Sequence, residues 1–414
     1  DAKPRQVTTW EGADSSPVFS PDGKTIAYLR GGPVKYAWYD SDQIATGSVK
    51  GGDERVVNPN YAQYVYSPRW SRDGKTLYFL VEDDRITSLA SMALTGGEPE
   101  ILFPTRSNPG VARSFEVGAK GIAALVTFPQ RPAEIYRVED AVALTDHNQE
   151  FRDSIEWGSV EGFDATSADS VAVGSMLRKP PGFRKGKKYP TIFYIHGGPV
   201  GQDAFDFDFT AQLLAAQGYL VVQPNYRGSS GRGREFSRAI YADWGNLEIQ
   251  DIHAVADKLV EEGLSDPDRL GIGGWSYGGI NTNFAIATDT RFSAAISGSG
   301  AANYIAGYGT DQYIWQYENE VGLPWVSIDT YLKMSYPFLN ADRIETPTLF
   351  MCGEKDFNVP LINSEQMYQA LRSLNVPTQL VIYPGEYHGL SKPSNIQDRL
   401  ERWIDWYARY LGED

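Results

Sequence analysis

The first 150 residues contain short runs in which apolar and polar residues alternate, and turns rich in Pro, Asp and Gly separate these runs. Alternation with a period of two is typical of half-buried β-strands. The segment at residues 16–28, Ser-Pro-Val-Phe-Ser-Pro-Asp-Gly-Lys-Thr-Ile-Ala-Tyr, returns at residues 67–79 as Ser-Pro-Arg-Trp-Ser-Arg-Asp-Gly-Lys-Thr-Leu-Tyr-Phe. A repeat of about 50 residues predicts blades of a β-propeller, each with an Asp-Gly hairpin turn whose two residues tolerate positive φ.

A third unit around residues 114–126 keeps the hairpin rhythm but lacks the Asp-Gly turn. The segment therefore holds about three blades, whereas a closed propeller needs at least about four. We expect an incomplete propeller, in a chain that is the C-terminal piece of a longer or nicked polypeptide. The missing blades would lie on a second chain or have been lost.

Residues 151–414 follow a different pattern, in which apolar strand-like runs alternate with segments of helical period. This order predicts a doubly wound, mostly parallel sheet. We therefore divide the chain into an all-β segment, residues 1–150, and an α/β domain, residues 151–414. Expected strands lie at 219–223, 269–273, 293–297, 347–352 and 379–383, and expected helices lie at 247–262, 278–288, 364–374 and 395–411.

The composition suits two buried cores and excludes two classes of partner. Apolar residues make up 42% of the 414 positions, which is ample for two domains. The formal net charge of −15 would repel nucleic-acid phosphates, and no apolar run approaches the length of a membrane span. We expect neither a nucleic acid nor a membrane as partner. The basic residues within 178–188 are interpreted as a solvated interdomain loop, and Asp251 as a surface or capping acid.

Cysteine and histidine are scarce. The single cysteine, Cys352, falls on an expected core strand and excludes an internal disulfide. The four histidines are scattered without metal-ligand spacing, so we expect no metal and no cofactor. The sequence starts at Asp1 with neither an initiator methionine nor a signal peptide, which indicates a trimmed mature chain. A periplasmic or extracellular location is favoured over the cytoplasm. The compartment and a homo-oligomeric state stay open.

Residues 271–279, Gly-Ile-Gly-Gly-Trp-Ser-Tyr-Gly-Gly, contain the pattern G-x-S-x-G between an expected strand and an expected helix. This order is that of a nucleophile elbow, in which Gly274 and Gly278 leave room for a sharp turn that exposes Ser276. The same glycines do not form a dinucleotide fingerprint, because no G-x-G-x-x-G with a following ribose-binding acid is present. Ser276 is the candidate nucleophile.

A serine hydroxyl needs a general base and an acid that orients it. In the chain order Ser, acid, His, only one histidine follows Ser276, and this is His388, directly after an apolar strand. Asp356 follows the expected strand 347–352 and is the candidate acid. Glu354 is its nearest rival, but it stands only two residues beyond that strand and beside Lys355, where a solvated turn carboxylate is the simpler interpretation.

An oxyanion hole needs backbone N–H donors. One is expected from Tyr277, the residue after the nucleophile, and the other from Gly198 in the loop His196-Gly-Gly-Pro that ends an apolar strand. A plain tight turn would also explain Gly-Gly-Pro taken alone.

These motifs resemble those of the prolyl oligopeptidase family over about residues 150–414. The matching stretches are His196-Gly-Gly-Pro, Asn225-Tyr-Arg-Gly-Ser-Ser-Gly, Gly274-Trp-Ser-Tyr-Gly-Gly, Lys355-Asp-Phe-Asn-Val-Pro and Tyr387-His-Gly. The chain is similar to the acylaminoacyl peptidase and dipeptidyl peptidase branches, which join an α/β-hydrolase domain to an N-terminal β-propeller. The resemblance implies a triad of Ser276, Asp356 and His388, and a serine exopeptidase that acts on short peptides through an acyl-enzyme.

Two departures from the family pattern bear on the substrate. Some dipeptidyl peptidases have a tyrosine where His196 stands, and many acylaminoacyl peptidases have arginine where Asn358 stands. Asn358 resembles the asparagine with which dipeptidyl peptidases hold a substrate carbonyl, and this favours dipeptide release. However, no pair of glutamates that could anchor a free amino terminus precedes residue 150, and Glu261-Glu262 lies in the other domain.

The segment 297–313 follows an expected strand and is rich in aromatic residues. We expect Tyr304 and Tyr308, together with Tyr277, to line the pocket for the residue before the cleaved bond, although core packing explains these tyrosines equally well. A carboxylesterase with the same triad is the alternative function. A non-catalytic binding module on the same scaffold is a third, disfavoured by the complete set of catalytic groups.

Overall fold

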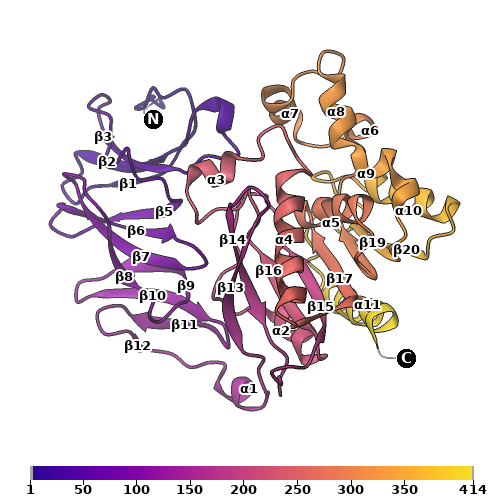
Figure 1. Ribbon diagram of the computed structural model, residues 1–414. Helices are drawn as coiled ribbons and strands as arrows, with labels where there is room; N and C mark the ends of the chain where they lie inside the picture. Colours follow the sequence, from indigo (N-terminus) through magenta and orange to yellow (C-terminus); the bar gives the residue numbers. More distant parts are fainter. Residues whose placement is uncertain (1–2, 413–414) are drawn as a thin grey trace. The chain divides into compact units, whose positions relative to one another are not determined.

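The structure is a computed structural model that describes residues 3–412, and it divides into two compact units. The first unit comprises the chain up to Glu156 together with two later segments, Ala204–Phe207 and Ser230–Arg238. The second comprises Trp157–Asp203, Asp208–Ser229 and the chain from Ala239 onward. Figure 1 labels most of the strands and helices of both units.

The first unit is built from three consecutive antiparallel meanders of four strands each (Figure 1). The strands are β1 (Asp14–Phe19), β2 (Thr25–Arg30), β3 (Gln43–Ser48), β4 (Arg55–Val56), β5 (Val65–Trp70), β6 (Thr76–Glu82), β7 (Thr87–Ala93), β8 (Glu100–Phe103), β9 (Val111–Val117), β10 (Ile122–Phe128), β11 (Arg131–Arg137) and β12 (Val142–Ala143). One parallel bridge, Thr87 to Val111, joins the second and third meanders. The alternating pattern therefore predicted the all-β character of this segment correctly.

Two apolar clusters hold the meanders face to face. Leu29 and Ile44 of the first meander pack with Phe79 of the second, whereas the adjacent Leu80 packs with Phe115 of the third. Successive side chains on a strand point to opposite faces, so β6 contributes to both clusters. This is why its residues 76–82 read as a nearly continuous apolar run.

The repeated turns differ from the expected hairpin geometry. Gly23 and Gly74 have positive φ, at 69° and 71°, but the preceding Asp22 and Asp73 do not. Instead, the Asp22 carboxylate accepts hydrogen bonds from the Ser20 hydroxyl (2.7 Å) and the Lys24 N–H (3.1 Å). The aspartate thus stabilises a longer turn through its side chain, and only the glycine needs the left-handed conformation.

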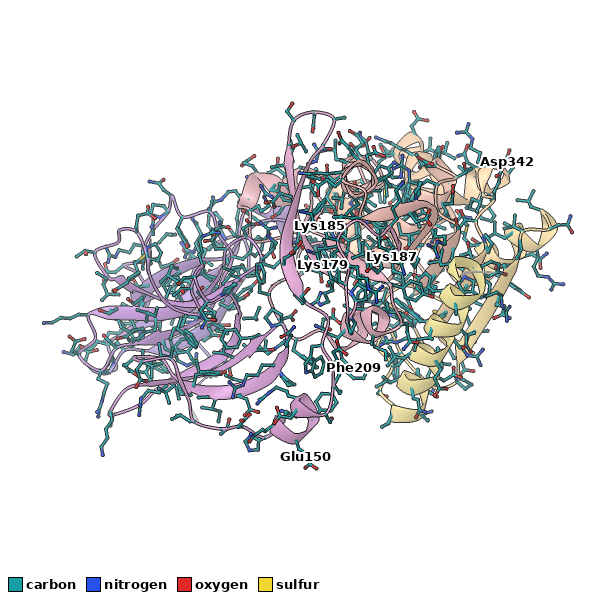
Figure 2. The ribbon with its side chains drawn as sticks, turned by 60° about the horizontal axis from the view of Figure 1, so that its bottom comes forward. Glu150, Lys179, Lys185, Lys187, Phe209 and Asp342 are labelled. Atoms are coloured by element: carbon teal, nitrogen blue, oxygen red, sulfur yellow. The ribbon has the colours of Figure 1, made fainter. Side chains whose placement is uncertain are left out.

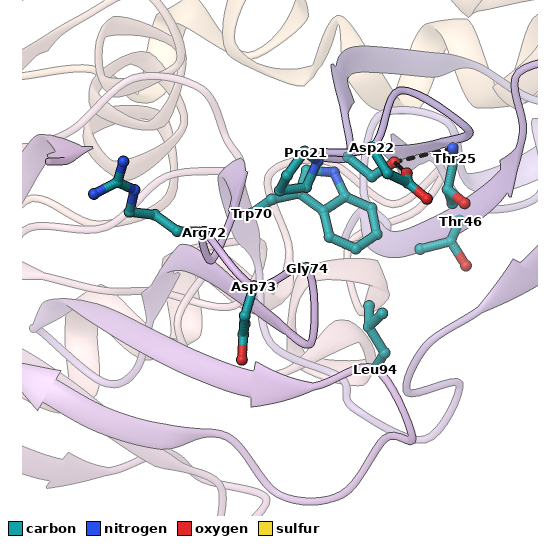
Figure 3. A pocket seen from close by; sticks show the side chains of 10 residues that line it. Pro21, Asp22, Thr25, Thr46, Trp70, Arg72, Asp73, Gly74 and Leu94 are labelled. Atoms are coloured by element: carbon teal, nitrogen blue, oxygen red, sulfur yellow. Dashed lines mark hydrogen bonds between the residues drawn. The ribbon is translucent and has the colours of Figure 1, made fainter. Parts of the chain in front are cut away.

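A pocket of about 450 Å³ lies between these two turns in the first unit (Figure 3). Asp22, Trp70 and Asp73 are among its lining residues. The Trp70 indole N–H donates to the backbone carbonyl of Val18 (3.1 Å), so the ring is fixed between the first and second meanders. The aspartates are exposed and belong to the turns themselves.

The two later segments of the first unit are attached to its meanders by polar contacts. The Ser230 hydroxyl donates to the carboxylate of Glu82 on β6, and Asp206 forms an ion pair with Arg113 on β9 at 3.1 Å. The short helix α3 (Arg234–Arg238) also belongs to this unit. The first unit therefore depends on residues that follow the α/β strands in the chain.

The second unit contains an eight-stranded sheet in the order β13-β14-β16-β15-β17-β18-β19-β20. Its strands are β13 (Val160–Thr166), β14 (Ala172–Arg178), β15 (Tyr189–Ile195), β16 (Leu220–Pro224), β17 (Ser265–Trp275), β18 (Ala294–Gly298), β19 (Thr348–Gly353) and β20 (Thr378–Tyr383). The pairs β13–β14 and β14–β16 are antiparallel, and the remaining neighbours are parallel. This confirms the doubly wound, mostly parallel sheet of the α/β-hydrolase fold.

Helices cover both faces of this sheet. Tyr407 and Leu411 pack with Ile296 and Met351 of β18 and β19, while the neighbouring strand residues point toward the opposite face. The helices of the second unit are α2 (Phe209–Ala216), α4 (Leu247–Glu261), α5 (Tyr277–Thr288), α6 (Tyr304–Gly307), α7 (Ile314–Glu320), α8 (Ile328–Met334), α9 (Tyr336–Leu339), α10 (Ile362–Ser373) and α11 (Pro393–Leu411), and α1 (Gln149–Asp153) lies in the first unit. The four helices expected from the sequence all appear, with ends shifted by one or two residues.

Two sequence-based interpretations are wrong. The basic segment 178–188 is not an interdomain loop, because it joins β14 to β15 within the second unit, and Arg178 is fully buried. Figure 2 labels Lys179, Lys185 and Lys187 in this segment. Asp251 is not a surface acid: it is fully buried on α4 and forms an ion pair with Arg227 at 2.7 Å.

Within residues 3–412, none of the helices is both long and apolar enough to cross a membrane.

Candidate active site

Ser276 stands at the sharp junction between β17 and α5. Its φ of 61° and ψ of −123° lie in a region that residues other than glycine rarely occupy. A Cβ at Gly274 or Gly278 would approach the carbonyl oxygen of Ile195 to 2.2 or 2.1 Å. The backbone conformation and these two tight approaches are those of a nucleophile elbow, as the G-x-S-x-G pattern predicted.

Asp356 and His388 form an acid and base pair in which the aspartate is buried and the histidine is partly exposed. The His388 Nδ1–H donates to Asp356 Oδ2 at 2.8 Å, and the aspartate side chain is fully buried. Asp356 Oδ1 accepts from the backbone N–H groups of Asn358 and Val359, both at 2.9 Å. Because a carboxylate only accepts, Nδ1 carries the proton and Nε2 keeps a lone pair. The imidazole is therefore in the tautomer that a general base requires.

Glu354, the rival acid, lies elsewhere. It is exposed, and its carboxylate accepts from the backbone N–H of Gly385 at 2.8 Å. Its side chain closes a turn between the loops that follow β19 and β20. It has the role of a turn carboxylate that the sequence indicated.

The elbow and the histidine loop are linked directly. The Trp275 indole N–H donates to the backbone carbonyl oxygen of His388 at 2.7 Å. On the other side of the elbow, a Cβ added at Gly197 would lie 3.2 Å from the Ser276 Cβ. The structure therefore brings the loops that carry Gly197, Ser276 and His388 to one edge of the sheet, where the carboxyl ends of the parallel strands meet.

Glu386 organises the histidine loop and was missed by the sequence analysis. Its carboxylate accepts from the backbone N–H groups of Ser391 (2.9 Å) and Lys392 (3.0 Å) and from the Asn395 side chain (2.7 Å). These backbone donors lower the pKa of Glu386 to about 2. The buried carboxylate thus ties the loop to the start of α11. A glutamate two residues before His388 was the available signal, but its partners become visible only in the fold.

The loop that carries Gly198 is held by a neutral histidine. His196 Nδ1–H donates to the carbonyl of Gly197 (2.8 Å), so Nε2 accepts from the Ser229 hydroxyl (2.9 Å). Burial lowers the pKa of His196 to about 4. The Tyr226 hydroxyl donates to the carbonyl of His196 (2.9 Å), and the two rings stack at 4.5 Å. The motif Asn225-Tyr-Arg-Gly-Ser thus supports the expected oxyanion loop.

Tyr277 is fixed by a buried carboxylate on α4. Its hydroxyl donates to Glu248 Oε1 at 2.8 Å, and its ring packs edge-on against Trp244. Glu248 also accepts from the N–H groups of Gly245 (2.8 Å) and Asn246 (3.2 Å), and burial raises its pKa to about 7. The phenol of Tyr277 is therefore engaged with α4, while its backbone begins α5 beside Ser276.

The expected substrate residues lie on neighbouring segments. Tyr304 on α6 is buried against Trp244, with ring centroids 5.4 Å apart. Tyr308 is half-buried, and its hydroxyl bonds Glu318 at 3.3 Å. Asn358 is half-buried two residues beyond Asp356, so the acid and the amide share one short loop. Among residues 3–412, no group of His, Cys, Asp and Glu side chains is arranged to hold a metal ion.

The model of the Prolyl oligopeptidase family matches residues 205–414. The chain belongs to the prolyl oligopeptidase family.

The similarity to individual proteins extends beyond residues 205–414 and covers both units. Dipeptidyl-peptidase 5 of Porphyromonas gingivalis is 29% identical over 97% of this chain and 60% of its own length. An uncharacterized peptidase of Bacillus subtilis is 30% identical over 83% of this chain and 53% of its own. The solved Pyrococcus horikoshii acylaminoacyl peptidase has a TM-score of 0.85 at 25% identity, covering 95% of this chain and 63% of that one. The chain thus spans 53 to 63% of the length of these three proteins.

Among members of the prolyl oligopeptidase family, a structure described as acylaminoacyl peptidase in complex with a Z-Gly-Gly-Phe chloromethyl ketone is also similar, at 26% identity and a TM-score of 0.85. The similarity to acylaminoacyl peptidases includes the all-β segment as well as the α/β-hydrolase domain, because it covers 95% of the chain. Both parts of the predicted fold class are therefore confirmed.

Proposed function

We propose that this chain is the catalytic part of a serine exopeptidase that hydrolyses short peptides through an acyl-enzyme on Ser276. One observation carries the proposal: the Asp356–His388 pair is tied through the Trp275 indole to the strained elbow that presents Ser276. Membership of the prolyl oligopeptidase family supports the same reaction class.

In the proposed mechanism, Ser276 Oγ attacks the scissile carbonyl while His388 Nε2 takes its proton. Asp356 keeps the imidazole in the required tautomer and stabilises the imidazolium. The backbone N–H groups of Gly198 and Tyr277 are the proposed donors to the oxyanion. His388 then protonates the leaving amine, and water, activated by the same base, releases the acyl group.

The proposed substrates are peptides that present a short acyl portion to the site. Asn358 would bind the carbonyl one residue before the residue at the cleaved bond, and Tyr304 and Tyr308 would contribute to the pocket for that residue. The similarity to dipeptidyl and acylaminoacyl peptidases supports both a free and a blocked amino terminus as candidates. The acidic chain, with a net charge of −15, favours neutral or cationic peptides.

Labelling tests the nucleophile, and substrate comparison tests the reaction. A fluorophosphonate probe should label the wild type and fail to label Ser276→Ala. The wild type should also hydrolyse dipeptide anilides, measured against matched esters. Ester turnover without anilide turnover would instead identify a carboxylesterase, and absence of labelling would contradict a catalytic role for Ser276. A panel of free and Nα-blocked dipeptide anilides would then separate the two exopeptidase types.

We also propose that the all-β segment, residues 1–150, is part of a β-propeller attached to a catalytic domain at 151–414. Three meanders are fewer than a closed ring needs, so further blades on a longer chain or a partner chain would complete it. A ring of this kind would restrict access to short or unfolded peptides. Native mass spectrometry that finds only an active 46 kDa monomer would contradict the additional blades.

A further inference from the structure

The acceptor atom of the Asn358 side chain is already occupied. Asn358 Oδ1 accepts hydrogen bonds from the Tyr313 hydroxyl and from the side-chain amide Nε2 of Gln312. An amide oxygen has two lone pairs, so these two donors use its capacity. The two N–H groups of Asn358 Nδ2 are the donors that remain.

The segment that supplies both donors is itself fixed. The backbone N–H of Gln312 donates to the carbonyl of Phe357 at 3.1 Å, which places Gln312 beside the Asn358 loop. The N–H of Tyr313 donates to Asp311 Oδ1 (2.8 Å), and the Tyr317 hydroxyl donates to Asp311 Oδ2 (2.7 Å). The Tyr313 hydroxyl thus approaches Asn358 from a segment whose backbone is held at two points.

The backbone of Asn358 is also constrained, from the opposite end. Its N–H donates to Asp356 Oδ1 at 2.9 Å, and the other oxygen of the same carboxylate accepts from His388. The amide group therefore keeps a fixed position relative to the base. What remains to be selected is the orientation of the amide about its last torsion, that is, whether N–H groups or the oxygen face outward.

This orientation has a direct chemical consequence. With Nδ2 outward, the side chain donates to a substrate carbonyl oxygen. With Oδ1 outward, the Asn358 oxygen and the substrate carbonyl oxygen would face each other, and these two acceptors would repel. The second orientation would point Nδ2 at Gln312 and Tyr313, so the Gln312 amide would have to rotate to present its Oε1 and the Tyr313 hydroxyl would have to accept instead of donate.

We propose that Gln312 and Tyr313 are positioning residues that hold the Asn358 amide with its N–H groups toward the carbonyl one residue before the cleaved residue. The inference rests on the proposed function, because it needs an acyl group bound at Ser276. It also defines a substrate class: peptides with an amide carbonyl at that position gain from the arrangement, and single-residue acyl donors do not.

Two p-nitrophenyl esters test the proposal: an amino acid ester and the ester of the same residue extended by one residue at its amino end. Only the extended ester carries the carbonyl in question. Tyr313→Phe should lower kcat/KM about tenfold for the extended ester, the order expected for one hydrogen bond, and less than about twofold for the amino acid ester. An equal loss on both esters would indicate general damage and overturn the proposal.

A double-mutant cycle gives a second readout. In the Asn358→Ala background, Tyr313→Phe should have no further effect on the extended ester, because the group that it orients is gone. Gln312→Ala should behave in the same way. Additive losses would contradict action through Asn358.

The matched control is Tyr336→Phe. It removes the hydroxyl of Tyr336 on α9, which accepts a hydrogen bond from Arg343 at 2.9 Å. It should leave the ratio of the two kcat/KM values unchanged. The proposed function and the positioning role can fail separately. If the wild type hydrolyses neither ester and is not labelled at Ser276, the proposed function is wrong. If hydrolysis depends on Ser276 but Tyr313→Phe shows no preference between the esters, only the positioning role is wrong.

Discussion

The Trp275 indole N–H donates to the backbone carbonyl oxygen of His388 at 2.7 Å, across 113 residues of sequence. Trp275 directly precedes Ser276, so one side chain couples the turn of the nucleophile to the loop of the base. The contact acts on the backbone of His388 and leaves the ring to Asp356. It therefore positions the base without using a catalytic atom.

Trp275→Phe removes this donor and keeps an aromatic ring. We expect kcat for a dipeptide anilide to fall about tenfold, because the histidine loop loses the hydrogen bond that holds its backbone beside the elbow. Trp403→Phe is the matched control, since the buried Trp403 N–H has no hydrogen-bond partner among the described residues. Equal kcat values for Trp275→Phe and the wild type would show that the loop keeps its position without the indole.

Asp356→Asn tests the acid while leaving the size of the side chain unchanged. An amide at this position can donate to His388 Nδ1 and select the wrong tautomer, so kcat should fall on the order of 10⁴ with little change in melting temperature. Glu354→Gln should stay within about twofold of the wild type, because its glutamine oxygen can still accept from Gly385. Comparable losses in the two variants would remove the distinction between triad acid and turn acid.

Glu248 should make stability depend on pH in a direction opposite to that of most carboxylates. Burial raises its pKa from 4.5 to about 7 in the folded chain. Between these values the native state binds a proton that the unfolded state has lost, so the free energy of unfolding decreases as pH rises to about 7 and levels off above it.

The Glu248→Gln variant isolates this contribution from that of other titrating groups. The difference in the free energy of unfolding between wild type and variant should shift by about 3 kcal/mol between pH 4.5 and pH 8. Urea denaturation at several pH values measures it, and His196, with a folded pKa of about 4, cancels in the comparison. A constant difference would mean that Glu248 titrates normally.

Arg227 has two acidic partners that differ in burial, and this difference predicts how much each contributes to the free energy of unfolding. Asp251 is fully buried, whereas the Asp169 side chain is 44% exposed. Asp251→Asn leaves a buried guanidinium with an incomplete partner and should lower the free energy of unfolding by about 3 kcal/mol. Asp169→Asn should cost less than about 1 kcal/mol. Equal costs in urea denaturation would contradict a dominant role for the buried pair.

The candidate triad could be found in the sequence because each member has a local signature. Ser276 lies in a glycine pattern that only a tight turn needs, and His388 and Asp356 each follow an apolar strand in the required order. Five strands and four helices of the second unit were predictable for a similar reason: their hydrophobic periods are local. The alternating segments likewise predicted the all-β character of the first unit.

The groups that support the triad could not be found in this way. Glu248 and Tyr277 are 29 residues apart, and Arg227 and Asp251 are 24 apart. An acid on an amphipathic helix looks the same in sequence whether it faces water or a buried cation, and so Asp251 was misinterpreted. The predicted two-residue hairpin turn at Gly23 was wrong for a local reason. The Asp22 side chain accepts hydrogen bonds from Ser20 and Lys24 and stabilises a longer turn instead.

The segments Ala204–Phe207 and Ser230–Arg238 belong to the first unit although the chain on either side of them builds the second. No single cut in the gene can therefore separate the two units intact. A fragment ending at Glu156 would leave Glu82 without the Ser230 hydroxyl and Arg113 without Asp206. A fragment beginning at Trp157 would carry these two segments without the β-meanders that they contact in the intact chain. Separate expression would require circular permutation or grafted loops. Because the chain passes between the two units several times, the folding of the second unit depends on the integrity of the β-meanders.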